Sequence, residues 1–463
     1  MSRLDRFFKD VQNRRVSIVG CGISGRAVYE FLRRALPTLP ITLYDDRAEA
    51  FSFALGDPYA TLCALSGGAC ELVGDLVFRT PSLRPDLPAF LAVRRRGGRV
   101  LTETDLVAEL CPCPLFGITG SDGKTTTATL THRLLAEEGA RRGFSAYLGG
   151  NVGQSLLPHL ATMTERDGAV LELSSFQLMD SRLPLAGAAV LNVTENHLNW
   201  HTDMAEYAAA KARILSRAKR AVLFADQPTL ASLAPEDACL FSATRPLSEL
   251  VSTFGADRSF VHLSEGWACL TEGGHTRPLF AVSCLSVRGI HMIENAMAAS
   301  ATVAHAVSEE TVRAVLSTFR GVPHRLTDLG TFAGVRVIDS GADTTPSRTA
   351  CSLAALECRP VVLCGGSDKG LSYAPLARAL CERACAAVLT GATAPAILAA
   401  FPTPPPIPVV VEEDFASAVR LAHALARGCG TLLFSPACAS FDRFANYVDR
   451  SRAFLQIVSH TQP

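Results

Sequence analysis

Two glycine-rich loops, each placed between a strand-like run and a helix-like run, constrain the fold of this chain more than any other feature. Gly20-Cys21-Gly22-Ile23-Ser24-Gly25 follows the β-rich run 16–19 and leads into a helical pattern over 26–36. Thr119-Gly120-Ser121-Asp122-Gly123-Lys124-Thr125-Thr126 follows the run 114–118 and leads into a predicted helix over 125–138. Such strand–turn–helix units repeat in proteins with parallel sheets. The sequence therefore predicts the α/β class.

The rest of the chain continues this alternation, and 463 residues are enough for about two to four domains. Further strands are predicted at 41–44, 169–173, 188–193, 221–224, 279–285, 335–339, 360–364, 387–389, 409–411 and 431–434, and helices at 102–110 and 290–307. We divide the chain into a Rossmann-like domain at 1–102, a central P-loop domain with a parallel sheet at 103–320 and a second Rossmann-like domain at 321–463.

Composition narrows the class of protein further. Lys plus Arg and Asp plus Glu both number 44, so the net charge is zero and no basic field predicts binding to nucleic acid or to an anionic membrane. The amino terminus lacks the apolar stretch of a signal peptide, and no run of about 18 apolar residues predicts a membrane span. The 15 cysteines include no CxxC pair, and several lie in apolar runs, so we expect buried, reduced thiols and no metal site built from them.

The first glycine-rich loop has the spacing of a dinucleotide fingerprint. Gly20-x-Gly22-x-x-Gly25 follows a strand, and Asp45 lies 20 residues beyond Gly25 at the end of the next strand. Glycines allow the backbone to approach a diphosphate, and the helix amino terminus supplies N–H groups. On this loop alone NAD or FAD is favoured over another diphosphate nucleotide, and both remain open.

The second loop resembles a P-loop, although Ile118 stands where a strict Walker sequence has its first glycine. Lys124 is suited to neutralise the β- and γ-phosphates of ATP, and Thr125 can offer its hydroxyl to Mg²⁺. Its presence in the middle of the chain indicates that the protein spends ATP, which a simple dehydrogenase does not.

Polar side chains follow two further strands of the central block. Glu172 and His197 each come after an apolar strand, where open α/β sheets bind ligands. One such residue is more often structural, but two beside a P-loop-like turn favour a metal–nucleotide site. Lys211 lies in an alanine-rich helix and, on physical grounds alone, is predicted to be solvated. Arg325 and Lys369 accompany loops of small residues at 365–370 and 435–440, which suits an anionic substrate.

Several strings together resemble the Mur ligase family over nearly the whole chain. They are Thr119-Gly120-x-x-Gly123-Lys124-Thr125-Thr126, Gly149-Gly150-Asn151, Glu172-Leu173-Ser174-Ser175-Phe176-Gln177, Asn192-Val193-Thr194-x-Asn196-His197, His291-x-x-x-Asn295, Pro323-His324-Arg325 and Ser435-Pro436-Ala437-Cys438-Ala439-Ser440-Phe441-Asp442. The resemblance is greatest to the branch that adds D-glutamate to the peptidoglycan stem peptide. It implies that UDP, and not NAD, occupies the first loop.

The resemblance also implies a role for each site residue. The UDP-linked substrate would contact Gly22, Ile23, Ser24, Asp45, Asp46, Arg47, Thr80, Asn151, Ser174 and His197. ATP would contact Gly120, Ser121, Asp122, Gly123, Lys124, Thr125, Thr126, Asn295, Arg325 and Asp339. The amino acid would contact Lys369, Ser440 and Tyr447. Two Mg²⁺ ions would be held by Thr125, Glu172, His197 and Lys211, with Lys211 carbamylated. The catalytic residues would be Lys124, Glu172, His197, Lys211 and Asp339.

The implied reaction joins D-glutamate to UDP-N-acetylmuramoyl-L-alanine. ATP converts a carboxylate into an acyl phosphate, which the amine then attacks. The resemblance further implies a cytoplasmic monomer that neither enters the membrane nor binds nucleic acid.

The chain departs from the family pattern at several positions. Ser121-Asp122 replaces the usual Thr-Asn, Met292 replaces an Asn, and Gly341 stands where the family places a lysine that helps to bind the amino acid. These departures motivate two alternatives, a sibling ligase that adds another amino acid and a weakened homologue that acts as an assembly partner. A nicotinamide oxidoreductase is a third.

Overall fold

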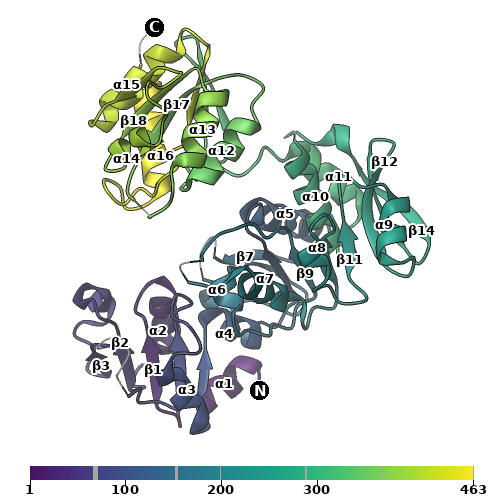
Figure 1. The fold of residues 1–463 in the computed structure, drawn as a ribbon. Helices are drawn as coiled ribbons and strands as arrows, with labels where there is room; N and C mark the ends of the chain where they lie inside the picture. Colours follow the sequence, from purple (N-terminus) through teal and green to yellow (C-terminus); the bar gives the residue numbers. More distant parts are fainter. Residues whose placement is uncertain (66–70, 152–154, 199, 287–288, 369, 462–463) are drawn as a thin grey trace. The chain divides into compact units, whose positions relative to one another are not determined.

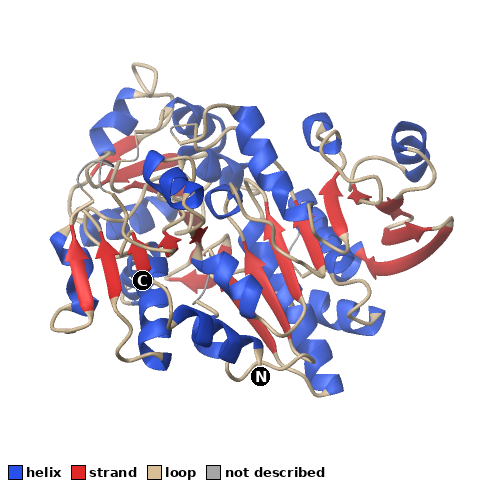
Figure 2. Ribbon diagram, turned by 90° about the horizontal axis from the view of Figure 1, so that it is seen from below, coloured by secondary structure: helices blue, strands red, loops and turns tan. Residues whose placement is uncertain are grey.

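The computed structural model describes residues 1–65, 71–151, 155–198, 200–286, 289–368 and 370–461. The chain forms two compact units, Met1–Phe319 and Arg320–Pro463 (Figure 1). Together they contain three sheets, and helices lie against the strands (Figure 2). None of the helices in the described ranges has the length and apolar character needed to cross a membrane.

The first sheet is fully parallel, with the strand order β3-β2-β1-β4-β5. Its strands are β1 (Val16–Val19), β2 (Ile41–Tyr44), β3 (Ala60–Cys63), β4 (Leu76–Arg79) and β5 (Arg99–Leu101). The accompanying helices are α1 (Arg3–Val11), α2 (Ile23–Ala35), α3 (Pro88–Arg95) and α4 (Glu103–Leu110). Strand β1 is buried at all four positions, as expected for a central strand of a parallel sheet.

The second sheet has nine strands in the order β14-β13-β12-β11-β10-β9-β6-β8-β7. They are β6 (Leu115–Thr119), β7 (Ala146–Gly150), β8 (Gly168–Glu172), β9 (Gly187–Val190), β10 (Ala221–Phe224), β11 (Cys239–Phe241), β12 (Ser259–Ser264), β13 (Trp267–Glu272) and β14 (His275–Ala281). Its helices are α5 (Lys124–Arg142), α6 (Ser175–Leu178), α7 (Met204–Ala212), α8 (Pro228–Ala231), α9 (Leu247–Phe254), α10 (Ile290–Thr302) and α11 (Glu309–Thr318).

One end of this sheet differs from the predicted all-parallel arrangement. Strands β12, β13 and β14 pair antiparallel with one another. The strand predicted at 279–285 corresponds to β14, which begins earlier, at His275, and ends at Ala281. Two-residue turns with positive φ, Glu265-Gly266 and Gly273-Gly274, connect the three strands. Turns of this geometry match the twist of a hairpin, and they reverse the chain without a crossover helix.

Salt bridges join the first sheet to the second within Met1–Phe319. The Arg84 guanidinium donates to the carboxylate of Glu206, at 2.9 Å, and to the carbonyl of Trp200. Arg79 and Arg94 both pair with Asp180. These contacts cross between loops of the two sheets, so the sheets pack as one unit.

The second unit contains the third sheet, in the order β15-β16-β20-β17-β18-β19. Its strands are β15 (Thr327–Phe332), β16 (Val335–Asp339), β17 (Val361–Gly365), β18 (Ala386–Thr390), β19 (Val409–Val411) and β20 (Thr431–Phe434). Its helices are α12 (Pro346–Ala354), α13 (Ala374–Arg383), α14 (Ala394–Ala399), α15 (Phe415–Ala426) and α16 (Tyr447–Ser459). All pairs are parallel except β15 with β16.

The α/β class and the layout of three sheets agree with the prediction. Eight of the described strands were not predicted, namely β3, β4, β5, β7, β11, β12, β13 and β15. The helix predicted at 290–307 ends earlier, because α10 stops at Thr302. The cysteines are less uniformly buried than expected, because Cys351 is exposed and Cys284, Cys385 and Cys429 are half-buried.

Candidate active site

The first glycine-rich loop closes tightly against its neighbours. Gly20 has φ +89°, and a Cβ there would overlap the side chain of Thr80. A Cβ on Gly25 would overlap the carbonyl of Gly20, whereas Gly22 faces open space and caps α2. The loop therefore leaves room for a ligand at Gly22, next to the helix amino terminus.

Asp45 supports this loop from the end of β2. Its Oδ2 accepts the N–H of Cys21 at 2.8 Å, and its Oδ1 accepts the N–H of Arg47 at 3.0 Å. Burial acts to raise the pKa of Asp45, but these hydrogen bonds and the Arg47 guanidinium outweigh it, so the pKa lies below its usual value. Asp45 is thus an ionised residue that fixes the loop.

The remaining predicted UDP contacts come from two places. Ile23 is 91% exposed at the start of α2, and Asp46 is exposed after β2. Ser24 hydrogen-bonds to the buried carboxyl of Glu103, whose pKa is raised by burial. Asn151, Ser174 and His197 instead follow strands of the second sheet.

Residues 191–194, beyond β9, hold the P-loop-like turn in shape. Gly120 (φ +157°) and Gly123 (φ +78°) allow the turn, and Gly123 caps α5. The N–H of Ser121 donates to the carbonyl of Asn192 at 2.7 Å, and the N–H of Asp122 donates to Oδ1 of Asn192 at 2.8 Å. The amino terminus of a 19-residue helix thus faces the turn, as an anion site requires.

Two lysines converge on one carbonyl of this loop. Nζ of Lys124 donates to the carbonyls of Gly120, at 2.9 Å, and Ser121, at 2.8 Å. Nζ of Lys211 donates to the same Gly120 carbonyl, at 2.8 Å. Lys211 is only 2% exposed, so the prediction that it is solvated was wrong. Helix α7 turns it inward, over the ring of Tyr207.

The surroundings of Lys211 favour the neutral amine. Burial lowers its pKa well below the usual value, and the charge of Lys124 lowers it further. The carboxylates of Asp122 and Glu172 act in the opposite direction but do not compensate. An uncharged amine is a nucleophile, so this lysine is suited to covalent modification.

Glu172, at the end of β8, carries an unpartnered buried oxygen. Its Oε1 accepts the side-chain N–H of Asn151 at 2.9 Å, but its Oε2 has no hydrogen-bond partner among the described residues. A buried carboxylate is costly without a cation. In the described part of the chain, no three His, Cys, Asp or Glu side chains group to hold a metal. A Mg²⁺ ion here would therefore need phosphate oxygens, the hydroxyl of Thr125 or a modified Lys211 as further ligands.

An aromatic cluster that sequence reasoning missed surrounds His197, which has φ +57°. The ring of Phe176 lies 4.9 Å from His197 and stacks on His201, and Tyr207 lies 5.1 Å from His201. Nε2 of His201 is 2.9 Å from Oγ of Ser175, and burial lowers the pKa of His201. The cluster fixes the loop that bears His197.

Asn295 approaches the P-loop-like turn from α10. Its Oδ1 accepts a hydrogen bond from the hydroxyl of Thr127 at 3.1 Å, and a Cβ on Gly123 would overlap this same Oδ1. The structure therefore places Asn295 against the turn, and its contact with ATP stays a prediction. Thr125 and Thr126 lie in the first turn of α5.

Asp339 occupies the corresponding edge of the third sheet, at the end of β16. Its Oδ2 pairs with Nδ1 of His324 at 2.6 Å, and its Oδ1 accepts the N–H of Gly341 at 2.8 Å. The predicted residue Arg325 follows His324, which has φ +64°. Ser440 is buried, Tyr447 begins α16, and Lys369 lies outside the described residues.

Position 341, where the family lysine is missing, has no room for a side chain. A Cβ on Gly341 would overlap Oγ of Ser451, which donates to Oδ1 of Asp339 at 3.2 Å. Close by, the buried Arg450 donates to the carbonyls of Cys438 and Ala439. Burial lowers the pKa of Arg450 to about 10.

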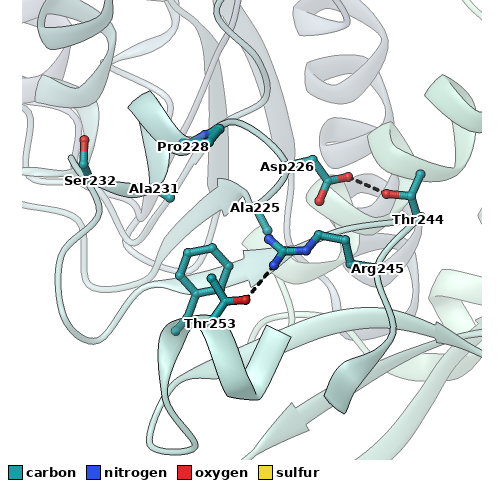
Figure 3. A pocket seen from close by; sticks show the side chains of 9 residues that line it. Ala225, Asp226, Pro228, Ala231, Ser232, Thr244, Arg245 and Thr253 are labelled. Atoms are coloured by element: carbon teal, nitrogen blue, oxygen red, sulfur yellow. Dashed lines mark hydrogen bonds between the residues drawn. The ribbon is translucent and has the colours of Figure 1, made fainter. Parts of the chain in front are cut away.

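A cavity of about 590 Å³ lies beside the loops that follow β10 and β11 (Figure 3). Oδ2 of Asp226 accepts the hydroxyl of Thr244 at 2.8 Å, and Arg245 donates to Thr253 at 2.7 Å. Burial and the charge of Asp226 raise the pKa of Glu294 to about 7. This cavity shares no lining residue with the glycine-rich loops, so it does not mark the site that they form.

Comparisons with known proteins show what this chain is similar to. The family model described as the Mur ligase middle domain matches residues 118–303. UDP-N-acetylmuramoylalanine–D-glutamate ligase from Ruminiclostridium cellulolyticum is 32% identical, over 99% of both chains, and the ligase of that name from Symbiobacterium thermophilum is 35% identical, over 96% of this chain and 97% of the relative. Among solved structures, UDP-N-acetylmuramate–alanine ligase MurC from Thermotoga maritima has a TM-score of 0.58 at 19% identity, covering 96% of this chain and 99% of the other. MurF from Acinetobacter baumannii has a TM-score of 0.57 at 15% identity, covering 98% of each chain.

Proposed function

Because this chain belongs to the Mur ligase family, among the UDP-N-acetylmuramoylalanine–D-glutamate ligases, we propose that it joins D-glutamate to UDP-N-acetylmuramoyl-L-alanine with ATP and Mg²⁺, through the residues described above. The observation that carries the assignment is the convergence of Lys124 and Lys211 on the Gly120 carbonyl, beside the unpartnered oxygen of Glu172. Lys124 supplies positive charge for the phosphates, the neutral amine of Lys211 is open to modification, and Glu172 offers an oxygen to a cation.

In the first step, a carboxylate oxygen of the UDP-linked substrate attacks the γ-phosphorus of ATP, and ADP leaves. Lys124 releases the Gly120 carbonyl and binds the β- and γ-phosphate oxygens, while backbone N–H groups at the start of α5 hold the phosphates in line. Asn295 would bind the remainder of ATP, and the family resemblance proposes Arg325 as a further ATP contact. The loop is already shaped, so little reorganisation is needed at the moment of transfer.

Mg²⁺ would be bound by Glu172, Thr125 and His197, and a second ion by a carbamate on Lys211. Such ions supply charge neutralisation for the transferring phosphoryl group. The lowered pKa of Lys211 supports this proposal, since carbamylation needs the unprotonated amine. Asn151 orients Glu172 through the hydrogen bond to Oε1.

In the second step, the amine of D-glutamate attacks the acyl phosphate, phosphate leaves and an amide forms. Asp339 would orient the amine or receive its proton, held in place by His324 and Gly341. Lys369, Ser440 and Tyr447 would bind the amino acid.

The UDP moiety would bind at Gly22, next to Ile23, Ser24, Asp46, Arg47 and Thr80. The proposed domains are residues 1–102 for the UDP-linked substrate, 103–320 for ATP and 321–463 for the amino acid. We further propose a cytoplasmic monomer that works without nucleic acid, since all three substrates are small and anionic.

The test is release of phosphate from ATP by the full-length protein, with UDP-N-acetylmuramoyl-L-alanine and a panel of amino acids. We expect release only when D-glutamate is present, and a loss of about 1000-fold or more in kcat for Lys124→Ala. Lys219→Ala, an exposed lysine on the same unit, is the matched control and should keep the wild-type rate. Release that depends on another amino acid would instead identify a sibling ligase, the alternative that the glycine at 341 favours.

A further inference from the structure

A pair of cysteines in the second unit lies outside every site described above. Cys385 immediately precedes β18, Cys429 lies two residues before β20, and their Sγ atoms are 2.9 Å apart. A disulfide bond is about 2.05 Å long, so the two sulfurs need to approach by less than about 1 Å. We propose that Cys385 and Cys429 form a modification site, at which a low-molecular-weight disulfide converts the two thiols into a disulfide.

Both thiols are half-buried, and a third cysteine lies close to them. Sγ of Cys429 is 3.5 Å from the carbonyl of Thr431, and Sγ of Cys358 is 3.7 Å from Oγ1 of the same residue. Cys358 also lines a cavity of about 210 Å³, together with Arg359, Arg383, Glu357 and Glu382. The two guanidinium groups and the two carboxylates suit a co-reactant that carries both carboxylate and ammonium groups, so the fitting chemical class is a small peptide disulfide.

The chemistry is thiol–disulfide exchange and it balances without any other reagent. The Cys429 thiolate attacks one sulfur of the small disulfide, and the first small thiolate leaves. The Cys385 sulfur then attacks Cys429 in this mixed disulfide, and the second small thiolate leaves. The protein loses two protons and two electrons, and the small disulfide gains both as two thiols. Burial and the neighbouring Cys429 sulfur raise the pKa of Cys385 to about 12, so Cys385 is the thiol that donates to Sγ of Cys429.

The cysteine pair lies at the amino-terminal ends of the strands, whereas Asp339 lies at their carboxyl-terminal ends. Strands β16, β20, β17 and β18 are parallel, Asp339 ends β16, and the two cysteines precede their strands. The new bond would link the starts of β18 and β20, which are both neighbours of β17. It closes a loop with a sequence separation of 44 residues, so it should stabilise the unit without changing ligase turnover.

The experiment treats the full-length wild-type protein with oxidised glutathione, alkylates free thiols and maps the peptides by mass spectrometry. We expect a linked peptide pair containing Cys385 and Cys429, a rise in Tm of about 5 °C or more, and a ligase rate within about twofold of the untreated protein. In Cys429→Ser, the same treatment should leave Tm unchanged. The buried pair Cys111 and Cys113, whose sulfurs are 3.3 Å apart, is the control for two thiols that are close together but not accessible to glutathione.

Two results would overturn the proposal. One is alkylation of both Cys385 and Cys429 after treatment, and the other is a separate glutathione on each sulfur with no bond between them. Neither result bears on the ligase reaction, because the readout is the state of the thiols.

Discussion

Replacing Gly341 by alanine tests how the space beside Asp339 is used. The new Cβ would overlap Oγ of Ser451 and lie 3.0 Å from Oδ1 of Asp339 and 3.2 Å from Cε1 of Phe434. Ser451 therefore has to turn away, and it then loses its hydrogen bond to Asp339. The substitution both overpacks a buried site and removes a donor from a carboxylate.

The expected cost follows from these two contacts. Overpacking a buried site costs about 1–3 kcal/mol, and a hydrogen bond to a charged group contributes about 1.5–3 kcal/mol. Ser451→Ala should lose only the hydrogen bond. In the double variant, the oxygen that the Cβ meets is absent, so the combined loss should fall short of the sum by about 1–2 kcal/mol.

Thermal unfolding of the full-length variants measures this coupling, since each kcal/mol corresponds to roughly 2–4 °C for a unit of this size. Ser459→Ala, at an exposed position on the same helix, is the matched control and should shift Tm by less than about 1 °C. Strictly additive effects of Gly341→Ala and Ser451→Ala, or no effect of Gly341→Ala, would refute this account of the missing lysine.

Three further predictions concern the first unit. Lys211→Arg keeps a permanent charge and cannot be carbamylated, so it should lower kcat by at least about 100-fold and abolish any gain from added bicarbonate; a wild-type rate in bicarbonate-depleted buffer would contradict this. The pKa of Glu294 in the folded protein is about 7, above its usual 4.5, so the stability of the wild-type protein falls as the pH rises between these values. The Tm of Glu294→Gln relative to that of the wild type should therefore increase from about pH 5 to pH 8. A Tm difference that stays constant over this range would exclude the effect. The Arg84 guanidinium lowers the pKa of Glu206 to about 2, so the ionised Glu206 stabilises the fold fully above about pH 4.5, and this stabilisation is lost towards pH 2. Glu206→Gln should therefore lower the Tm at pH 7. The Tm difference between variant and wild type should narrow by about pH 3 in the same melting series.

Local sequence signals were sufficient for parallel strands such as β1, β6 and β17 and for both glycine-rich loops, whereas the parallel strands β3, β4, β5, β7 and β11 were missed. The antiparallel end of the second sheet was missed, although Glu265-Gly266 and Gly273-Gly274 are hairpin signals of the kind that sequence can reveal. Strand β7 was missed because it ends in Gly149-Gly150, which lowers its apparent strand propensity.

The environment of a side chain was harder to predict than its presence in a motif. Lys211 was interpreted as solvated because an alanine-rich helix shows no strong apolar face, yet its buried Nζ donates to the carbonyl of Gly120, 91 residues away. The contact of Ser451 with Asp339 spans 112 residues, and the pairing of Cys385 with Cys429 spans 44. Contacts of this kind depend on how strands are ordered in a sheet, which residue patterns do not specify.

The point at which the chain passes from one unit to the other offers a route to dissecting the protein. Phe319 is buried in the first unit, beneath the guanidinium of Arg133, whereas Arg320 is exposed. Trypsin cleaves after arginine, so a brief digestion at this position should divide the chain into two fragments that each keep a complete core. A cut near residue 102 would fall within the first unit. The two pieces would stay together through Arg84 and Glu206, and the nicked protein should elute from a sizing column as if it were intact.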